Sequence, residues 1–223
     1  MIVFDIETGP LPTAELEDRI PKFEAPANYK DESKIAAYIT QKRLDWIERA
    51  ALDATTGKIL AIGILDCRED GVEKVNTLAG DEAEIIAAFS SIVMQCGGSG
   101  WPLVGWNIFG FDLPFILRRS WILRVALPQW VRSGRYWDRC FIDAMDVWAC
   151  GNREQAVSLD LAAATLGVGR KSGSGAHFAS LWNGSDEERA HALEYLENDL
   201  RLTKAVAERI LPAGFREIER RAA

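Results

Sequence analysis

The sequence has few cysteines, and it lacks both long apolar runs and the cysteine spacing of a metal site. Its four cysteines form no CxxC pair and are too sparse for a disulfide framework: Cys67, Cys96, Cys140 and Cys150. They predict reduced thiols in the cytoplasm and argue against a structural zinc site. No apolar run approaches the length of a membrane span. A strand that begins at residue 2 would leave no room for a signal peptide.

The composition predicts an ordinary soluble globular protein. The chain has 223 residues, of which 48% are hydrophobic and 26% are charged. This length lies within the usual range of a single domain, about 100–250 residues. The formal net charge of -7 argues against a protein that holds nucleic acid by bulk attraction alone. It does not exclude a nuclease, because carboxylates that hold divalent cations form a site that attracts phosphate.

The first eight residues, MIVFDIET, predict a central strand that carries two acids. Side chains alternate along a strand, so the apolar residues at positions 2, 4 and 6 share one face, and Asp5 and Glu7 share the other. Acids are uncommon in so apolar a strand unless they are paired or bind a cation. The pair is therefore a candidate metal site. The alternative is a strand that ends early and leaves both acids in solvent, and the pair alone does not decide between the two.

A long insertion follows Thr8. Prolines at positions 10, 12, 21 and 26 predict about twenty residues without regular structure. Ser33 is the expected cap of a helix that ends at the 53–57 turn and carries Ile35, Tyr38, Ile39, Trp46 and Ile47. The insertion, at about residues 10–50, leaves the sheet beside Glu7, and we expect it to overhang the acidic pair.

The rest of the chain alternates between predicted strands and helices. We expect strands at residues 58–66, 72–78 and 103–106, and a turn at Asp70-Gly71 joins the first two. Expected helices run from a capping box at Asp81 and Glu84 to Gly97-Gly98, from about Asp112 onward, from a cap at Ser158 to Gly167, and from a capping box at Ser185 and Glu188 to Pro212. The last helix has an apolar stripe that should pack on the sheet: Leu193, Leu196, Leu200, Ala207 and Ile210.

Two further stretches suggest contact with nucleic acid or phosphate, and each has a plainer explanation. Residues 118–139 combine arginines with tryptophans and a tyrosine, which suits a path for single-stranded nucleic acid. A solvated helix face with a few buried tryptophans would explain the same residues. Residues 167–175, GVGRKSGSG, follow a helix and lack the Walker spacing. We interpret them as a flexible loop rather than a phosphate cradle.

Two more acids lie where secondary structure would present them to the first pair. Asp112 opens a helix, and a helix N-terminus favours negative charge. A plain N-cap aspartate would explain Asp112 equally well, although it would not account for Asn107 and Phe111 beside it. Tyr195 and Asp199 are four residues apart on the last helix, so they share one face and flank the apolar stripe. A solvated pair would more naturally occupy the far side of the helix.

In chain order, these patterns resemble the three exonuclease motifs of the DEDD superfamily. The motifs are Asp5-x-Glu7, Asn107-x-x-x-Phe111-Asp112 and Tyr195-x-x-x-Asp199. The tyrosine matches the DEDDy branch, because the DEDDh branch has a histidine at the position that Glu194 occupies here. The first two motifs look most like those of predicted prokaryotic exonucleases related to the proofreading domain of family B DNA polymerases. The resemblance spans nearly the whole chain and implies a free-standing exonuclease.

The resemblance implies an RNase H-like α/β fold. We expect a mixed five-stranded sheet flanked by helices, with the first strand central and the acids gathered at its exit. Residues 1–212 would form the exonuclease domain, with the insertion at about 10–50, and residues 213–223 would form a charged tail. Beyond the resemblance, the insertion leaves the sheet beside Glu7, and we expect it to form one wall or a lid of the substrate groove.

The resemblance also implies two divalent cations, Mg2+ or Mn2+, as cofactors. Asp5 would bridge the two ions, and Glu7 and Asp199 would complete the ligands of the first. Asp112 would hold the second ion, partly through water. Tyr195 would orient the attacking water, since an unperturbed tyrosine titrates near pH 10, too high for full proton abstraction.

The implied substrate is single-stranded DNA, cut from its 3′ end to release nucleoside 5′-monophosphates. Thr8 would meet the terminal nucleotide, and Asn107 and Phe111 would hold the strand next to it. One alternative is a 3′-5′ exoribonuclease like RNase D, because no residue is predicted to sense a 2′-OH. Another is a member that binds nucleic acid without cleaving it, although every expected ligand is present in the sequence.

Overall fold

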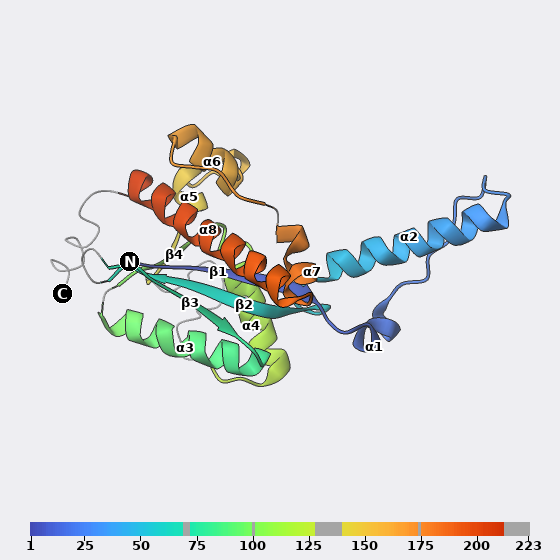
Figure 1. Cartoon of the computed structure of the whole chain (residues 1–223), viewed down its shortest axis with the longest axis horizontal. Coiled ribbons are helices and arrows are strands. Elements are labelled where there is room, and N and C mark those ends of the chain that lie inside the picture. The colour runs from blue at the N-terminus through green and yellow to red at the C-terminus, as the bar shows by residue number, and fades with distance from the viewer. Residues whose placement is uncertain (69–71, 100, 128–139, 174, 212–223) are drawn as a thin grey trace.

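The computed structural model describes residues 1–68, 72–99, 101–127, 140–173 and 175–211 (Figure 1). The expected turn at Asp70-Gly71, the part of the basic and aromatic stretch from residue 128 to 139, and the charged tail lie outside these residues. None of the helices in the described ranges is both long enough and apolar enough to cross a bilayer.

The strands form one mixed sheet of five in the order β3-β2-β1-β4-β5. They are β1 (Ile2–Pro10), β2 (Gly57–Asp66), β3 (Lys74–Ala79), β4 (Leu103–Gly105) and β5 (Phe141–Asp143). β2 is antiparallel to β1 and β3, whereas β4 and β5 run parallel to β1. The predicted α/β class, the five strands and the central position of the first strand are confirmed. The sequence did not locate β5, which is only three residues long.

Helices cover both faces of the sheet (Figure 1). α3 (Glu82–Ser99) and α4 (Asp112–Leu123) cover one face. α8 (Asp186–Ile210) crosses the other face and contacts β1, β2 and β4, and the shorter helices α5, α6 and α7 pack against it. These are α5 (Ala144–Trp148), α6 (Leu159–Leu166) and α7 (Phe178–Trp182), with single 3-10 turns at Arg153–Gln155 and Gly175–His177.

The alternation along β1 separates the core from the acids. Phe4 lies fully buried among residues of α3 and β5, with its ring centroid 5.0 Å from that of Phe89. Val3 points to the opposite face and packs with Leu200 and Ala207 of α8. Because side chains alternate along a strand, Asp5 also points toward the α8 face, as predicted.

The helix boundaries mostly agree with the capping signals. Ser158 and Ser185 cap α6 and α8, the second through a complete capping box with Glu188, and Gly167 ends α6 in a left-handed conformation. α3 runs past the two glycines to Ser99. The expected stripe on α8 is wrong at Leu193, which is 37% exposed.

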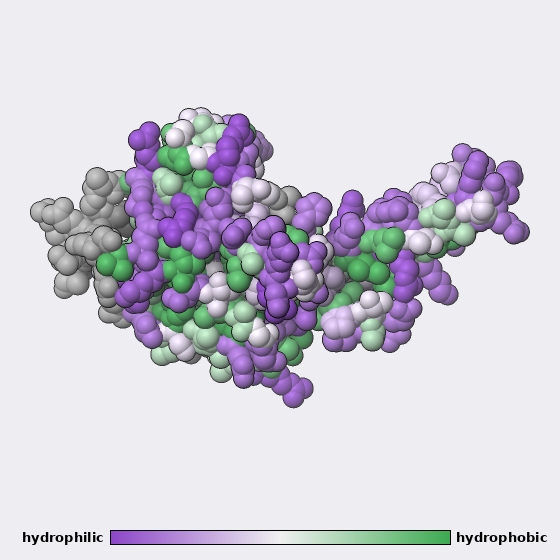
Figure 2. Space-filling view, in the orientation of Figure 1, coloured by the Kyte–Doolittle hydropathy of each residue, from purple (hydrophilic) through white to green (hydrophobic). Residues whose placement is uncertain are grey.

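The insertion forms an arm that projects from the body (Figure 1). It contains α1 (Thr13–Leu16), a 3-10 turn at Glu17–Arg19 and α2 (Glu32–Ala50), so the expectation of twenty irregular residues is wrong in part. The N-cap of α2 is Asp31 rather than Ser33, because the Asp31 carboxylate accepts hydrogen bonds from the amides of Ser33 and Lys34. Figure 2 shows apolar surface where the arm meets the body and mostly polar surface toward its tip.

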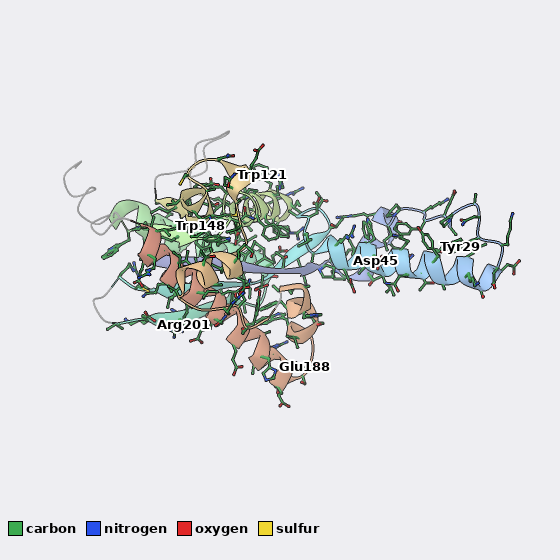
Figure 3. All side chains as sticks on the ribbon, turned by 90° about the horizontal axis from the view of Figure 1, so that it is seen from above. Tyr29, Asp45, Trp121, Trp148, Glu188 and Arg201 are labelled. Atoms are coloured by element: carbon green, nitrogen blue, oxygen red, sulfur yellow. The ribbon has the colours of Figure 1, made fainter. Side chains whose placement is uncertain are left out.

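The arm has only a small core of its own. Leu11, Leu16 and Ala50 are buried together at its base, whereas the expected apolar residues of α2 are only half-buried. Toward the tip, Tyr29 contacts Tyr38 of α2 with ring centroids 5.7 Å apart. Tyr29 and Asp45 both lie on the projecting part of the molecule (Figure 3). No arm residue lines either cavity described below, so its role as a wall or lid stays a prediction.

Candidate functional site

The site lies where β1 and β4 separate. The two strands pair only at Ile2 with Leu103 and at Val3 with Val104, after which β4 ends at Gly105. The next amide of β1 that faces this gap is that of Ile6, and it donates to Asp112 Oδ1 over 3.1 Å. A buried amide must find an acceptor. The gap in the sheet therefore holds Asp112, the first residue of α4, against the middle of β1.

A glycine in β2 lets α8 approach the acids of β1. Gly63 is the direct partner of Asp5 in the antiparallel ladder, so the two residues share a face of the sheet. A Cβ atom at Gly63 would lie 2.8 Å from Leu196 Cγ and 2.9 Å from Leu200 Cδ1 of α8. The missing side chain therefore allows the close packing that places Asp199, between these two leucines in sequence, beside Asp5.

Three of the predicted acids converge. Ligand oxygens of Asp5, Glu7 and Asp199 all lie within 4.8 Å of one another. Glu7 and Asp199 are buried, at 7% and 3% exposed, and Asp5 is half-buried. Asp112, also 3% exposed, is close enough that its charge raises the pKa of Asp5. The structure thus brings together four carboxylates that are up to 194 residues apart, from Asp5 to Asp199.

Burial and mutual repulsion hold these carboxyl groups toward their neutral forms. Burial raises the pKa of Asp5 well above its ordinary value, and the charges of Asp112, Glu7 and Asp199 raise it further. Burial and then the Asp199 charge raise the pKa of Glu7 to about 8. Burial raises the pKa of Asp112 to about 7, although the Ile6 amide acts in the opposite direction. A bound divalent cation would lower these pKa values, because its positive charge stabilises the ionised carboxylates.

Tyr195 lies beside the acids, one helical turn before Asp199. It is 9% exposed. Burial raises its pKa first, and the neighbouring charges of Asp199 and Glu7 raise it further. The phenol therefore stays protonated throughout the physiological range.

Lys171 belongs to the site, although the sequence did not indicate it. Its Nζ lies 2.5 Å from Asp199 Oδ2 and 5.2 Å from the centroid of the Tyr195 ring. Its backbone amide donates to Asp160 Oδ1 over 2.9 Å, so α6 holds the loop that carries it. The stretch had been interpreted as a flexible loop. A lysine in a glycine-rich loop carries no local signal for a partner 28 residues away.

The glycines of the same loop let it lie against the side chains of Tyr195 and Glu7. A Cβ atom at Gly173 would lie 3.3 Å from the Tyr195 ring. A Cβ atom at Gly175 would lie 3.5 Å from the Tyr195 hydroxyl and 3.9 Å from Glu7 Oε2. The loop thus covers one side of the site with backbone rather than side chains.

The donor set fits a hard divalent cation. All of the converging groups are carboxylate oxygens, the ligands that Mg2+ and Mn2+ prefer. Asp199 Oδ1 is buried and has no hydrogen-bond partner among the described residues, which is rare for a buried polar atom. The Lys171 ammonium pairs with the other oxygen of that carboxylate, Oδ2. The unsatisfied Asp199 oxygen could serve as a ligand, and a bound cation would offset the repulsion between the acids.

A cavity of about 350 Å³ joins the acids to the predicted substrate residues. Asp5, Asp112 and Asp199 line it together with Asn107 and Phe111, and Trp106 and Met145 also contribute. Glu7 and Thr8 do not line this cavity. Tyr195 lines a second cavity of about 490 Å³ together with Ser172 and Gly173, whereas Lys171 lines the first.

Asp143 is a second residue that the sequence did not indicate. It ends β5, is 2% exposed, and accepts hydrogen bonds from the amides of Asn107, Phe109 and Met145. Burial raises its pKa, whereas the three amides act to lower it. The aspartate at 143 precedes a short helix, so the only local signal was that of an N-cap.

The basic and aromatic stretch that suggested a nucleic-acid path divides in two. Arg119 is 3% exposed and pairs with Glu82 over 2.6 Å, so it is structural. Arg118 and Arg124 are exposed, and Trp121, labelled in Figure 3, is 66% exposed. The part from residue 128 to 139, with Arg132, Arg135, Arg139, Trp130, Tyr136 and Trp137, lies outside the described residues.

Comparison with known proteins gives one family and a related fold. Residues 51–206 match the model of a family described as a predicted 3′-5′ exonuclease related to the exonuclease domain of PolB. The matched segment includes Asp112, Tyr195 and Asp199 but not Asp5 and Glu7. No curated protein matches the chain.

The fold is similar to that of the family B DNA polymerase from the hyperthermophilic archaeon Pyrobaculum calidifontis. The two structures superpose with a TM-score of 0.59 at 20% sequence identity. The superposition covers 95% of this chain but only 24% of the polymerase chain. At this identity the likeness concerns the fold alone.

Proposed function

The chain belongs to the family of predicted 3′-5′ exonucleases related to the exonuclease domain of PolB, and on that premise we propose that it hydrolyses single-stranded DNA from the 3′ end. The products would be nucleoside 5′-monophosphates. The activity is proposed for the cytoplasm, where the sparse cysteines of the sequence would stay reduced. Residues 1–212 would form the nuclease domain and the arm would be an insertion in it.

The convergence of the carboxylates is the observation that supports this proposal most strongly. Asp5, Glu7 and Asp199 present ligand oxygens within 4.8 Å of one another. Asp112 accepts a hydrogen bond from the amide of Ile6, which lies between Asp5 and Glu7 on β1. We propose that these four residues hold two divalent cations, Mg2+ or Mn2+. When bound, such a pair would supply a water of lowered pKa and positive charge for the attacking and leaving oxygens of a phosphodiester.

The remaining residues of the site would orient the reactants. Tyr195 keeps its proton and can therefore donate a hydrogen bond that orients the attacking water. Lys171 lies against Asp199 and over the Tyr195 ring, where its charge would offset the repulsion between the acids and attract the phosphate. Neither group needs to change its protonation state for these roles.

The shape of the first cavity suits the end of one strand. Its volume of about 350 Å³ is at the lower end of the range for pockets that bind small ligands, roughly 300–1,000 Å³. Phe111 offers an aromatic face and Asn107 an amide at the same wall as Asp112. We propose that these two residues hold the nucleotide next to the cleaved bond and that Thr8, which follows Glu7 on β1, meets the terminal one.

The direct test uses oligonucleotides that carry a label at one end only. With Mn2+, a 5′-labelled single strand should shorten progressively from its 3′ end, and a 3′-labelled strand should release its label as a mononucleotide at once. Asp5→Asn should abolish both results, whereas Asp18→Asn, at an exposed aspartate of the arm, should change neither. Shortening from the 5′ end, or no cleavage with any divalent cation, would contradict the proposal.

Matched DNA and RNA strands then separate the substrate classes. We expect faster hydrolysis of DNA, because no described residue of the first cavity is assigned to a 2′-OH. A faster rate on RNA would instead indicate an exoribonuclease. Binding of strands by wild type and Asp5→Asn alike, without cleavage by either, would indicate a non-catalytic member of the fold.

A further inference from the structure

Asp143 lies next to residues that line the first cavity, and its side chain accepts hydrogen bonds from backbone amides of one turn and of the next helix. Its Oδ1 accepts from the amides of Asn107, over 2.8 Å, and of Met145, over 3.0 Å. Its Oδ2 accepts from the amide of Phe109 over 2.9 Å. Both carboxylate oxygens are thus used, and the side chain is 2% exposed.

The turn that Asp143 holds has a conformation that side chains disfavour. Asn107 has φ of 61°, in the left-handed region. The Asn107 side chain lies over Gly110, where a Cβ atom would lie 2.3 Å from Asn107 Oδ1. Backbone of this kind persists only where the surrounding structure holds it. Two amides of this turn donate to Asp143: that of the left-handed residue Asn107 and that of Phe109, two residues later.

The same turn leads directly into the acid site. Asn107 accepts hydrogen bonds through its carbonyl from the amides of Gly110 and Phe111, and the following residue, Asp112, begins α4. Asp112 then reaches across the gap between β1 and β4 to the amide of Ile6. The position of Asp112 therefore depends on the turn at one side and on the strand at the other.

We propose that Asp143 is the positioning residue of this site: it holds the Asn107–Phe111 turn by its amides and so places Asp112 against β1. The inference rests on the proposed function only for its consequence in catalysis, since the contacts themselves need no substrate. Groups that orient metal ligands typically change metal affinity or activity by about 10–100-fold when they are removed. Asp143 would act in this way through backbone, without touching the substrate.

The carboxylate cannot be replaced by the amide of nearly equal size. Asparagine offers one acceptor oxygen and places an NH2 donor where Asp143 accepts from an amide. Asp143→Asn would leave either the Phe109 amide or the amides of Asn107 and Met145 without an acceptor. Aspartate is thus required for its two oxygens at this position.

The test follows the Ile6 amide, which reports where Asp112 lies. In Asp143→Asn, the hydrogen exchange of that amide should become at least about tenfold faster, while the amides of β2 keep their protection. In the same protein, Mn2+ affinity measured by calorimetry should fall by about 10–100-fold and the Michaelis constant for DNA should rise. Asp143→Ala removes both oxygens without adding a donor, and it replaces the asparagine variant if that variant does not fold.

A matched control separates positioning from a loss of stability. Asp31 also accepts two backbone amides, but it caps α2 on the arm. Asp31→Asn should leave Ile6 exchange and Mn2+ affinity as in wild type. A folded Asp143 variant with wild-type Ile6 exchange and Mn2+ affinity would overturn the inference. Ile6 exchange is read without substrate, so a protein that lacks nuclease activity would refute the proposed function while still testing this one.

Discussion

Two ion pairs among the described residues, Arg119–Glu82 and Lys171–Asp199, differ in how completely their hydrogen bonds are satisfied. Arg119 and Glu82 are joined over 2.6 Å below the sheet, and Lys171 and Asp199 are joined over 2.5 Å above it. In the first pair, Glu82 also accepts from the Ile59 amide and Arg119 also donates to the Ala54 carbonyl. In the second pair, Asp199 Oδ1 lacks a partner among the described residues and two further acids lie beside it.

The difference separates a structural pair from a functional one. The pair at Arg119 ties α4 to α3 and to the turn after α2, and its hydrogen bonds leave nothing for a ligand to improve. Lys171 pairs with one carboxylate, that of Asp199, in a cluster of acids whose negative charges repel one another. The protein loses stability when a fully bonded buried ion pair is broken. An ion pair with an unsatisfied oxygen can still make an interaction with a ligand.

The largest expected effect is on activity and concerns the incomplete pair. Asp199→Asn should lower the cleavage rate by about 10³-fold or more, since it removes a proposed metal ligand. Without divalent cations the variant should be at least as stable as wild type, because one repelling charge is gone. Single-turnover cleavage and thermal melting measure the two effects. Asp186→Asn, exposed in the first turn of the same helix, should change neither; a variant that stays active would contradict the assignment of Asp199.

The next effect is on stability and concerns the complete pair. Arg119→Met leaves the Glu82 carboxylate buried without its partner and should cost about 3–5 kcal/mol of unfolding free energy, measured in urea. The folded fraction should keep its rate of cleavage, because Arg119 does not line either cavity. Adding Glu82→Gln should restore part of the stability, since the amide oxygen can still accept from Ile59. Unchanged stability in the single variant would show that the pair contributes little.

The pH dependence of stability should distinguish the acid cluster from an ordinary set of carboxylates. The pKa of Glu7 rises from its ordinary value of 4.5 to about 8 on folding, and that of Asp112 rises from 3.8 to about 7. The folded protein therefore holds protons that the unfolded chain has lost, so without divalent cations stability should fall as pH rises from about 5 to 8. Thermal melts in a chelator measure this fall, and stability that increases across the same window would contradict it.

Mn2+ should offset this fall in stability with rising pH, because it binds the deprotonated carboxylates and its affinity rises with pH. Melts repeated with saturating Mn2+ should show little loss of stability up to pH 8. In Asp199→Asn, the difference in stability between the melts with saturating Mn2+ and the melts in a chelator should become smaller.

The smallest effect concerns the lysine of the incomplete pair. Lys171 acts to lower the pKa of both Asp5 and Glu7. Lys171→Met should therefore destabilise the cation-free protein at neutral pH by roughly 1 kcal/mol, in line with a partly exposed pair. Saturating Mn2+ should restore most of that loss. An equal loss with and without Mn2+ would mean that the lysine does not share the electrostatic role of the cation.

Much of the fold followed from local signals. The alternation of β1, the buried run of β2 and the caps at Ser158 and Ser185 were sufficient for the class of sheet and for two helix starts. Two expectations that were wrong, at the starts of α1 and α2, have local causes. Prolines did not prevent α1, because Pro12 stands just before its first residue, where no amide donor is needed.

The arm and the fifth strand were harder to predict for opposite reasons. α2 has an apolar pattern, yet most of that face is only half-buried, since the helix leaves the body. β5 has three residues and too little periodicity to be recognised, although it occupies the edge of the sheet and carries Asp143. Pattern predicts which residues prefer to be buried, but not how much of the molecule is available to bury them.

The sequence alone singled out the acids that lie together in the fold, because each of them has a fixed offset within a local element: alternate residues of a strand, the first turn of a helix, one turn after a tyrosine. Their order along the chain then pointed to the exonuclease family. Only the tertiary structure decided what surrounds them. Lys171 and Asp143 act through contacts with residues 28 and 36 positions away, and spacing within one element contains no information about such partners. The packing of α8 against Gly63 and the gap between β1 and β4 supply that information.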